Sequence, residues 1–367
     1  MPRQQSAGSI LPSLPPGARI LLIRLRSIGD IVLLTPALRL LKEWRPDLHV
    51  SVVVESRFRE LLENNPDVNE ILDPGAGSGW SRLASKARAI REIRRRKFAL
   101  CVNLHGGPTS SLLTSWSGAR WKAGFEHFRR RGVYQVLIPD ARTILNKPTI
   151  HTAEHQASAL FHLGLPRKEI PGARLFVGPN EESAWKERRV SIGLPTEGEY
   201  AVLHPTALYF TKQWAPENFA RLGQYLEHDI GLPVIYSCGP GEAAALDAVE
   251  KASGGSVRRV EGASLNLFAA ALAAARIFIG NDSGPAHMAA ALGRPGVVIF
   301  GSSSSTIWGP WPLGGGWETV QNDYECNPCP GDRCYRFERP ECILSVSYDQ
   351  VRAAVDRVLA RALPTPR

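Results

Sequence analysis

Short apolar runs alternate with amphipathic stretches along most of this 367-residue chain. Residues 19–25 (RILLIRL) are apolar enough for a buried strand, and residues 31–44 repeat apolar positions at helical spacing. The turn Ser27-Ile28-Gly29-Asp30 separates them, and Pro36 is expected to kink the helix mildly. Further strands are predicted at 50–54, 68–72 and 98–104, with a helix at 84–97. Strands that alternate with helices at this spacing predict a parallel α/β fold.

A second series of the same kind follows a less regular stretch. Between about residues 129 and 196 the pattern weakens around several prolines, so we place the domain crossing there. Beyond it we predict strands at 201–204, 233–238, 277–281 and 296–300 and helices at 216–228, 242–252, 264–275, 285–292 and 348–362. The predicted domains are 19–175 and 176–347, followed by a helix and tail at 348–367. Two doubly wound domains are expected to face a central cleft, where such folds bind ligands.

Composition adds a preference for anionic partners. Lys plus Arg total 44 against 35 Asp plus Glu, which gives a net charge of +9. The basic residues concentrate at 88–97 and 129–131 with few aromatics between them, and nothing beyond bulk charge indicates nucleic acid. Such runs are usually solvated faces, but two on one domain could form a patch for an anionic acceptor or a membrane surface. No apolar run is long enough to cross a membrane. Residues 1–18 are too polar for a signal peptide and are expected to form a disordered leader of a cytoplasmic protein.

The turn after the first strand offers a carboxylate, Asp30, at or near the start of a helix. One interpretation is an N-cap aspartate that accepts backbone N–H groups. The other is a general base at the edge of a cleft, with Ser27 and Gly29 bringing the backbone close to a substrate. The two interpretations compete because an N-cap bond lowers the pKa of a carboxylate.

The second domain carries the stronger signal, the turn 280–287 (GNDSGPAH) between a buried strand and a helix. Such a turn points backbone N–H groups and the positive end of a helix at a ligand, which suits a pyrophosphate near Ser283 and Gly284. His287 lies on the first helical turn, where it either reaches a phosphate oxygen or packs in the core. Thr206 and Lys212 follow the end of another predicted strand, where their hydroxyl and ammonium groups could bind a diphosphate. The alternative for Lys212 is a solvated surface lysine.

Glu242 follows the strand that ends at Cys238 and precedes a helix. Its carboxylate could hold the two hydroxyls of a ribose, or it could simply complement the helix dipole. Neither the GxxxxGK[ST] nor the GxGxxG pattern is present, which disfavours a P-loop ATPase and a standard dinucleotide-binding dehydrogenase.

Four of the six cysteines cluster near the C-terminus, at Cys326, Cys329, Cys334 and Cys342. Four thiols at this distance can build a zinc site, but the spacing lacks the paired CxxC form. Disulfides are disfavoured in a reducing compartment. A structural metal and free or redox-variable thiols therefore both stay open.

Several of these segments together resemble one family. RILLIRLRSIGDIVLLTPALRLL, HPTALYFTKQWAPENFARL, FIGNDSGPAHMAAALGRPGVVIFG and the tail CNPCPGDRC…CILSVSYDQV are similar to the bacterial lipopolysaccharide heptosyltransferases, glycosyltransferase family 9. The likeness runs from Arg19 to about Leu359 in the family's order. The segment between Thr206 and Lys212 looks longer than in some members, so residues 207–211 cannot be matched one by one.

The resemblance implies the GT-B fold, two Rossmann-like domains of which the second holds the nucleotide sugar. It implies an inverting transfer without a tightly bound metal or other cofactor, from ADP-heptose to an anionic glycolipid acceptor of the lipid A–Kdo type. The acceptor is expected at the cytoplasmic face of the inner membrane, where the protein associates peripherally. By the resemblance, the catalytic base is Asp30, and the diphosphate ligands are Thr206, Lys212, Ser283, Gly284 and His287. Glu242 would hold the ribose and Asp282 the nucleotide side.

Two alternatives stay open beside a glycosyltransferase. One is a nucleotide-sugar enzyme of another reaction type on the same fold, such as a hydrolysing 2-epimerase, which would act without an acceptor. The other is a non-catalytic member that only binds glycolipid or nucleotide. The joint presence of Asp30, Lys212 and His287 argues against the second alternative.

Overall fold

The computed structural model describes residues 7–75, 77, 79–311 and 316–361 of the chain. The chain divides into two compact units between Ala173 and Arg174, two residues before the predicted boundary. Each unit has its own parallel sheet and its own core, as expected for a chain of this length.

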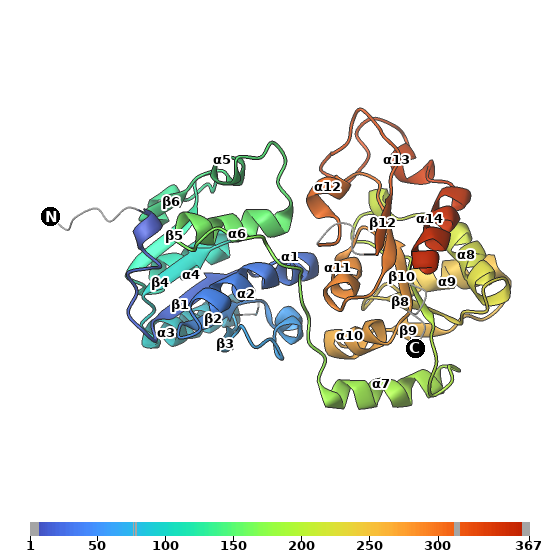
Figure 1. Cartoon of the computed structure of the whole chain (residues 1–367), viewed down its shortest axis with the longest axis horizontal. Coiled ribbons are helices and arrows are strands. Elements are labelled where there is room, and N and C mark those ends of the chain that lie inside the picture. Colours follow the sequence, from blue (N-terminus) through green and yellow to red (C-terminus); the bar gives the residue numbers. More distant parts are fainter. Residues whose placement is uncertain (1–6, 76, 78, 312–315, 362–367) are drawn as a thin grey trace. The chain divides into compact units, whose positions relative to one another are not determined.

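The first unit is built around a parallel sheet flanked by helices (Figure 1). Its described strands form one six-stranded sheet in the order β3-β2-β1-β4-β5-β6. The order reverses between β1 and β4, and this switch point is where doubly wound folds bind ligands. The elements are β1 (Arg19–Ile23), α1 (Ile28–Val32), α2 (Thr35–Trp44), β2 (His49–Val53), β3 (Glu70–Leu72), α3 (Gly79–Arg95), β4 (Leu100–Asn103), α4 (Pro108–Trp116), β5 (Trp121–Phe125), β6 (Val136–Ile138), α5 (Ala141–Leu145) and α6 (Thr152–His162).

Two predictions for this unit are wrong. The single kinked helix after Asp30 is two helices, because α1 ends at Val32 and α2 places Pro36 in its first turn, where the missing N–H costs no helical hydrogen bond. The described part of the expected disordered leader is packed instead. Ile10 and Leu11 are fully buried, and the Leu11 N–H donates to a carbonyl just after α6 at 3.0 Å.

The second unit repeats the architecture. Its described strands form a six-stranded parallel sheet in the order β12-β11-β10-β7-β8-β9, which reverses between β10 and β7. Gly280 and His204 are paired in register there, so the two strands end side by side. The elements are α7 (Pro179–Ser191), β7 (Ala201–His204), α8 (Pro216–His228), β8 (Val234–Cys238), α9 (Ala243–Ser253), β9 (Arg259–Glu261), α10 (Leu265–Ala273), β10 (Ile277–Asn281), α11 (Gly284–Ala291), β11 (Gly296–Ile299), α12 (Ser305–Trp308), β12 (Trp317–Val320), α13 (Glu341–Leu344) and α14 (Tyr348–Arg361).

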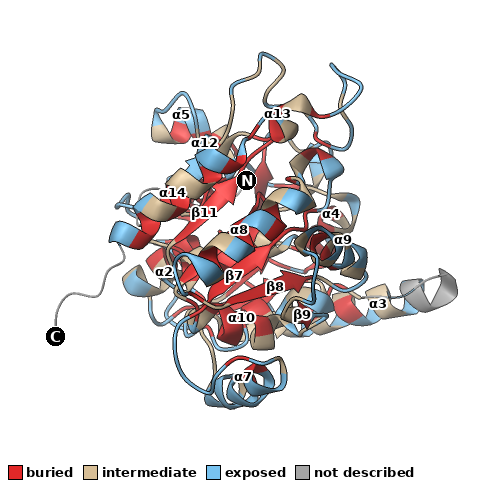
Figure 2. Ribbon diagram, turned by 90° about the vertical axis from the view of Figure 1, so that its right-hand side faces the viewer, coloured by how far each residue is buried: buried red, intermediate tan, exposed pale blue. Residues whose placement is uncertain are grey.

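The inner strands β7, β8, β10 and β11 are buried, while the helices around them expose their outer sides (Figure 2). The last helix, α14, belongs to the same core, because Val351, Val355 and Val358 are fully buried in one cluster with Leu203 and Ile279. Within the described residues, every helix is too short or too polar to cross a membrane.

Candidate functional site

The turn after β10 presents the start of α11 at the switch point of the second unit. Ser283 is the N-cap of this helix but makes no capping bond with its side chain, and its buried Oγ has no hydrogen-bond partner among the described residues. Gly284 is the first residue of the helix, and His287 is buried one turn further on. The first backbone N–H groups of a helix have no partner inside it and attract anions. The geometry therefore suits a phosphate group.

Lys212 reaches this turn from the neighbouring strand end. It lies in a short 3-10 helix, Phe210–Lys212, and its Nζ donates to the Asp282 carboxylate at 2.7 Å. The Lys212 side chain is 21% exposed and that of Asp282 is 6% exposed. The Ser303 hydroxyl donates to the same carboxylate oxygen. Lys212 is therefore not a solvated surface lysine, and the structure brings it together with the 282–287 turn across 70 positions of sequence.

One buried side chain fixes the loop that carries Thr206 and Lys212. Asn281, at the end of β10, accepts a hydrogen bond from the Trp214 N–H at 3.1 Å and donates to the Pro205 carbonyl at 2.8 Å. It is fully buried. Both ends of the loop are thus fastened by one amide group, a role that the sequence analysis missed. The only feature of the sequence that could have indicated this role is that Asn281 is a polar residue at the end of an otherwise apolar strand, next to Asp282.

Thr206 and Glu242 lie in direct contact. The Thr206 hydroxyl donates to the Glu242 carboxylate at 2.7 Å, and the Gly239 N–H donates to the same oxygen, Oε2, at 2.9 Å. Glu242 is the N-cap of α9 and is partly exposed. Its carboxylate is therefore oriented, with Oε1 left open among the described contacts. Because the hydroxyl proton of Thr206 is used by Glu242, a direct role for Thr206 at the diphosphate stays a prediction.

In the first unit, Ser27 is the N-cap of α1 and Asp30 is its third residue, so Asp30 is not itself the N-cap but closes a capping box, and the predicted bond to a backbone N–H is present. The carboxylate accepts a hydrogen bond from the Ser27 N–H at 3.0 Å and pairs with the Arg24 guanidinium. Arg24 also donates to the Leu104 carbonyl, so it joins the ends of β1 and β4. Asp30 thus lies at the switch point of this sheet, which fits a substrate-facing carboxylate, and its role as a base stays a prediction.

The four clustered cysteines line a common cavity of about 30 Å³ beside Thr211 and Ser302. All four are free thiols. Burial raises the pKa of Cys342 to about 11. Within the part of the chain that the structure describes, no three His, Cys, Asp or Glu side chains are grouped so that they could hold a metal ion.

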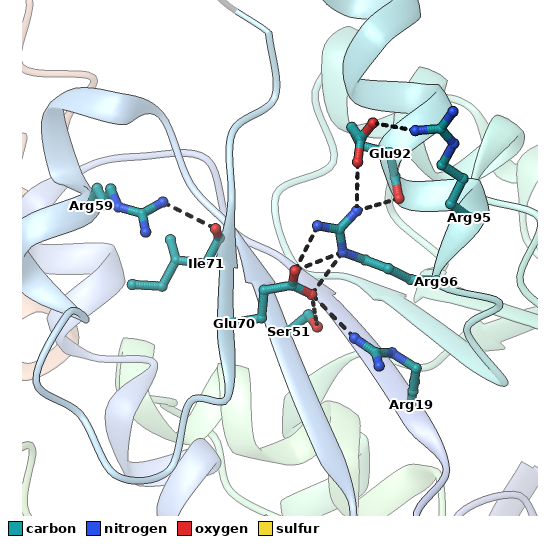
Figure 3. A network of polar contacts seen from close by, with 8 residues as sticks. All are labelled: Arg19, Ser51, Arg59, Glu70, Ile71, Glu92, Arg95 and Arg96. Carbon is teal, nitrogen blue, oxygen red and sulfur yellow. Dashed lines mark hydrogen bonds and ion pairs between the residues drawn. The ribbon is translucent and has the colours of Figure 1, made fainter.

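The basic runs of the first unit are partly neutralised. Arg96 pairs with Glu70 at 2.6 Å and with Glu92 at 3.2 Å, and Arg95 pairs with Glu92 at 3.1 Å (Figure 3). Burial acts to raise the pKa of Glu70, but the bonds from Arg96 hold it below its ordinary value. The exposed residues without a described ion pair, which could attract an anionic surface, are Arg88, Arg91, Arg94, Lys97, Arg129, Arg130 and Arg131.

The two doubly wound units, the second with a phosphate-type site at its switch point, match the GT-B fold of nucleotide-sugar enzymes. The chain belongs to glycosyltransferase family 9 (heptosyltransferase), whose sequence profile matches residues 86–336. This match includes the second-unit site and begins after Asp30. The chain is 27% identical over 352 residues to "Lipopolysaccharide heptosyltransferase 3" of Escherichia coli (strain K12), covering 93% of this chain and 98% of the relative.

Solved structures confirm the fold. A glycosyl transferase family 9 protein from Veillonella parvula DSM 2008 superposes with a TM-score of 0.81 at 22% identity, covering 97% of this chain and all of that one. The structure "E. coli heptosyltransferase WaaC with ADP" gives a TM-score of 0.69 at 18% identity, covering 94% of this chain and all of that one.

Proposed function

We propose that this glycosyltransferase moves a heptose from ADP-heptose to the inner core of lipopolysaccharide, with inversion at the anomeric carbon. The observation that supports a nucleotide-sugar donor is the site at the switch point of the second unit. There Lys212, the start of α11 and the unpartnered Ser283 Oγ supply positive charge and hydrogen-bond donors for a diphosphate. A related structure that contains ADP and a relative named for lipopolysaccharide heptose transfer support this choice of donor and acceptor.

The proposed chemistry is a single displacement. The Asp30 carboxylate takes the proton of an acceptor hydroxyl, the hydroxyl oxygen bonds to the anomeric carbon, and the bond from that carbon to the diphosphate breaks on the opposite face. Lys212 and the N–H groups of α11 stabilise the departing diphosphate. These groups provide positive charge, so the proposal includes no metal or other cofactor.

The proposed acceptor is an anionic glycolipid of the lipid A–Kdo type at the cytoplasmic face of the inner membrane. The exposed arginines of the first unit support this proposal, because they favour an anionic surface. The protein would then work in the cytoplasm as a peripheral membrane protein.

A thermal-shift series with ADP, UDP and GDP tests the donor. ADP at 100 times its dissociation constant is expected to stabilise the chain by about 2.7 kcal/mol. A larger shift with UDP or GDP would reject ADP-heptose as donor. Incubation of ADP-heptose with and without acceptor tests the reaction, since a hydrolysing epimerase would turn over donor alone, and NMR of the product gives its anomeric configuration.

A further inference from the structure

A chain of buried hydrogen bonds leads from the core of the second unit to Glu242. His204, the last residue of β7, contacts Ser237 Oγ through Nδ1 at 3.0 Å and Thr206 Oγ1 through Nε2 at 2.9 Å. Thr206 continues to Glu242 Oε2 at 2.7 Å. Ser237, His204 and Thr206 are each at most 5% exposed. Water therefore has little access to these bonds.

The direction of these bonds follows from the donors available. A carboxylate only accepts, so the single hydroxyl proton of Thr206 goes to Glu242. Thr206 must then accept from His204, which places the ring proton on Nε2. Nδ1 of the neutral ring then faces the Ser237 hydroxyl at 3.0 Å, whose single proton also has the Leu203 carbonyl within reach at 3.4 Å. Burial supports the neutral ring, because it lowers the pKa of His204 to about 4.

Packing holds the ring of His204 in this orientation. The rings of Phe268 and Phe278 lie beside it, with centroids 6.2 and 6.4 Å away. Asn281 fixes the backbone carbonyl of Pro205, which lies between His204 and Thr206. We call Ser237, His204, Thr206 and Glu242 the relay; its last member is the partly exposed Glu242 carboxylate.

We propose that His204 is a positioning residue that sets the nucleotide's ribose affinity through Thr206 and Glu242. The inference rests on the proposed function, in which Glu242 binds the ribose. With Oε2 held by Thr206 and Gly239, the open Oε1 accepts from the vicinal hydroxyls of the sugar. Loss of the His204 donor frees Thr206 to turn away, and the carboxylate loses its orientation.

The test compares binding of ADP and 2′,3′-dideoxy-ADP to the full chain by calorimetry. The unmodified protein is expected to bind ADP at least about tenfold more tightly, since the dideoxy nucleotide loses hydrogen bonds to a charged group. His204→Leu is expected to lose about tenfold in ADP affinity and to bind the dideoxy nucleotide as before. His204→Gln, whose amide can donate to Thr206, is expected to keep the discrimination.

Val202→Ala is the matched control, because this fully buried residue lies in the same strand outside the relay. It is expected to leave the ratio of the two affinities unchanged. Equal loss of both nucleotides in His204→Leu, a Gln variant that behaves like Leu, or a wild type that does not discriminate would overturn the inference. Tighter binding of UDP or GDP would reject the proposed donor alone, and the relay is then tested with that nucleotide and its dideoxy form.

Discussion

Replacing Lys212 by Met removes the positive charge from the proposed diphosphate site and keeps most of the aliphatic part of the side chain. If the ammonium contacts the diphosphate, the loss of a charged hydrogen bond costs about 1.5–3 kcal/mol, or roughly a 10- to 150-fold weaker ADP affinity. The same change leaves Asp282, 6% exposed, with Ser303 as its remaining described partner. Breaking a buried pair costs about 3–5 kcal/mol, and the 21% exposure of Lys212 reduces this to about 2 kcal/mol of unfolding free energy.

A second substitution separates binding from stability. Asp282→Asn in the Lys212→Met background removes the uncompensated charge, so urea unfolding is expected to show most of the lost stability restored. Calorimetry is expected to show that the ADP affinity stays as weak as in Lys212→Met. The reasoning is refuted if Lys212→Met binds ADP as the wild type does, or if the double variant regains binding together with stability.

Three other outcomes are expected. Asp30→Ala abolishes transfer and leaves ADP affinity within about twofold, because the proposed nucleotide site lies in the other unit; equal loss of both would indicate a folding role. Burial depresses the pKa of His204 to about 4 from 6.5, so its neutral form stabilises the fold above pH 6.5 and this contribution is lost as pH falls toward 4. Between pH 7 and 5 the wild type should therefore lose about 2 kcal/mol more than His204→Gln in urea unfolding, and parallel curves would contradict the assignment. The protein is expected to sediment with anionic vesicles at low salt and leave them near 1 M, where the Debye length is about 3 Å. Charge reversal at Arg94, Arg95 and Arg130 should abolish this sedimentation while ADP still binds; unchanged sedimentation would mean a merely solvated face.

The apolar strands and the glycine-containing turns of this molecule could be predicted from the sequence. The bounds predicted for β7 and β10 match the structure, because buried parallel strands are continuous apolar runs. α7 was not predicted, because Trp185 is its only buried apolar residue and no apolar repeat at helical spacing marks it. β6 was not predicted because it is an edge strand of only three residues, too short to form a recognisable apolar run.

The turns of the candidate site were visible in the sequence, but the contacts between them were not. Lys212 and Asp282 are 70 positions apart, and only the strand order places β7 beside β10. The ion pair between Arg24 and Asp30 was not predicted for a different reason. Arg24 lies in an apolar run that indicates only a strand. Contacts between distant residues and the direction of a side chain can be known only once the fold is known.

The double attachment of Asn281 has a consequence for how this site can vary. Its amide fastens the chain at Pro205 and Trp214, and the segment between them includes the residues that could not be matched to other members. A loop tied at both ends can lengthen in its middle at small entropic cost. Evolution, or a protein engineer, can therefore vary the exposed residues 208–210, while Thr211, buried against Ser302 and Gly331, helps to keep Lys212 next to Asp282.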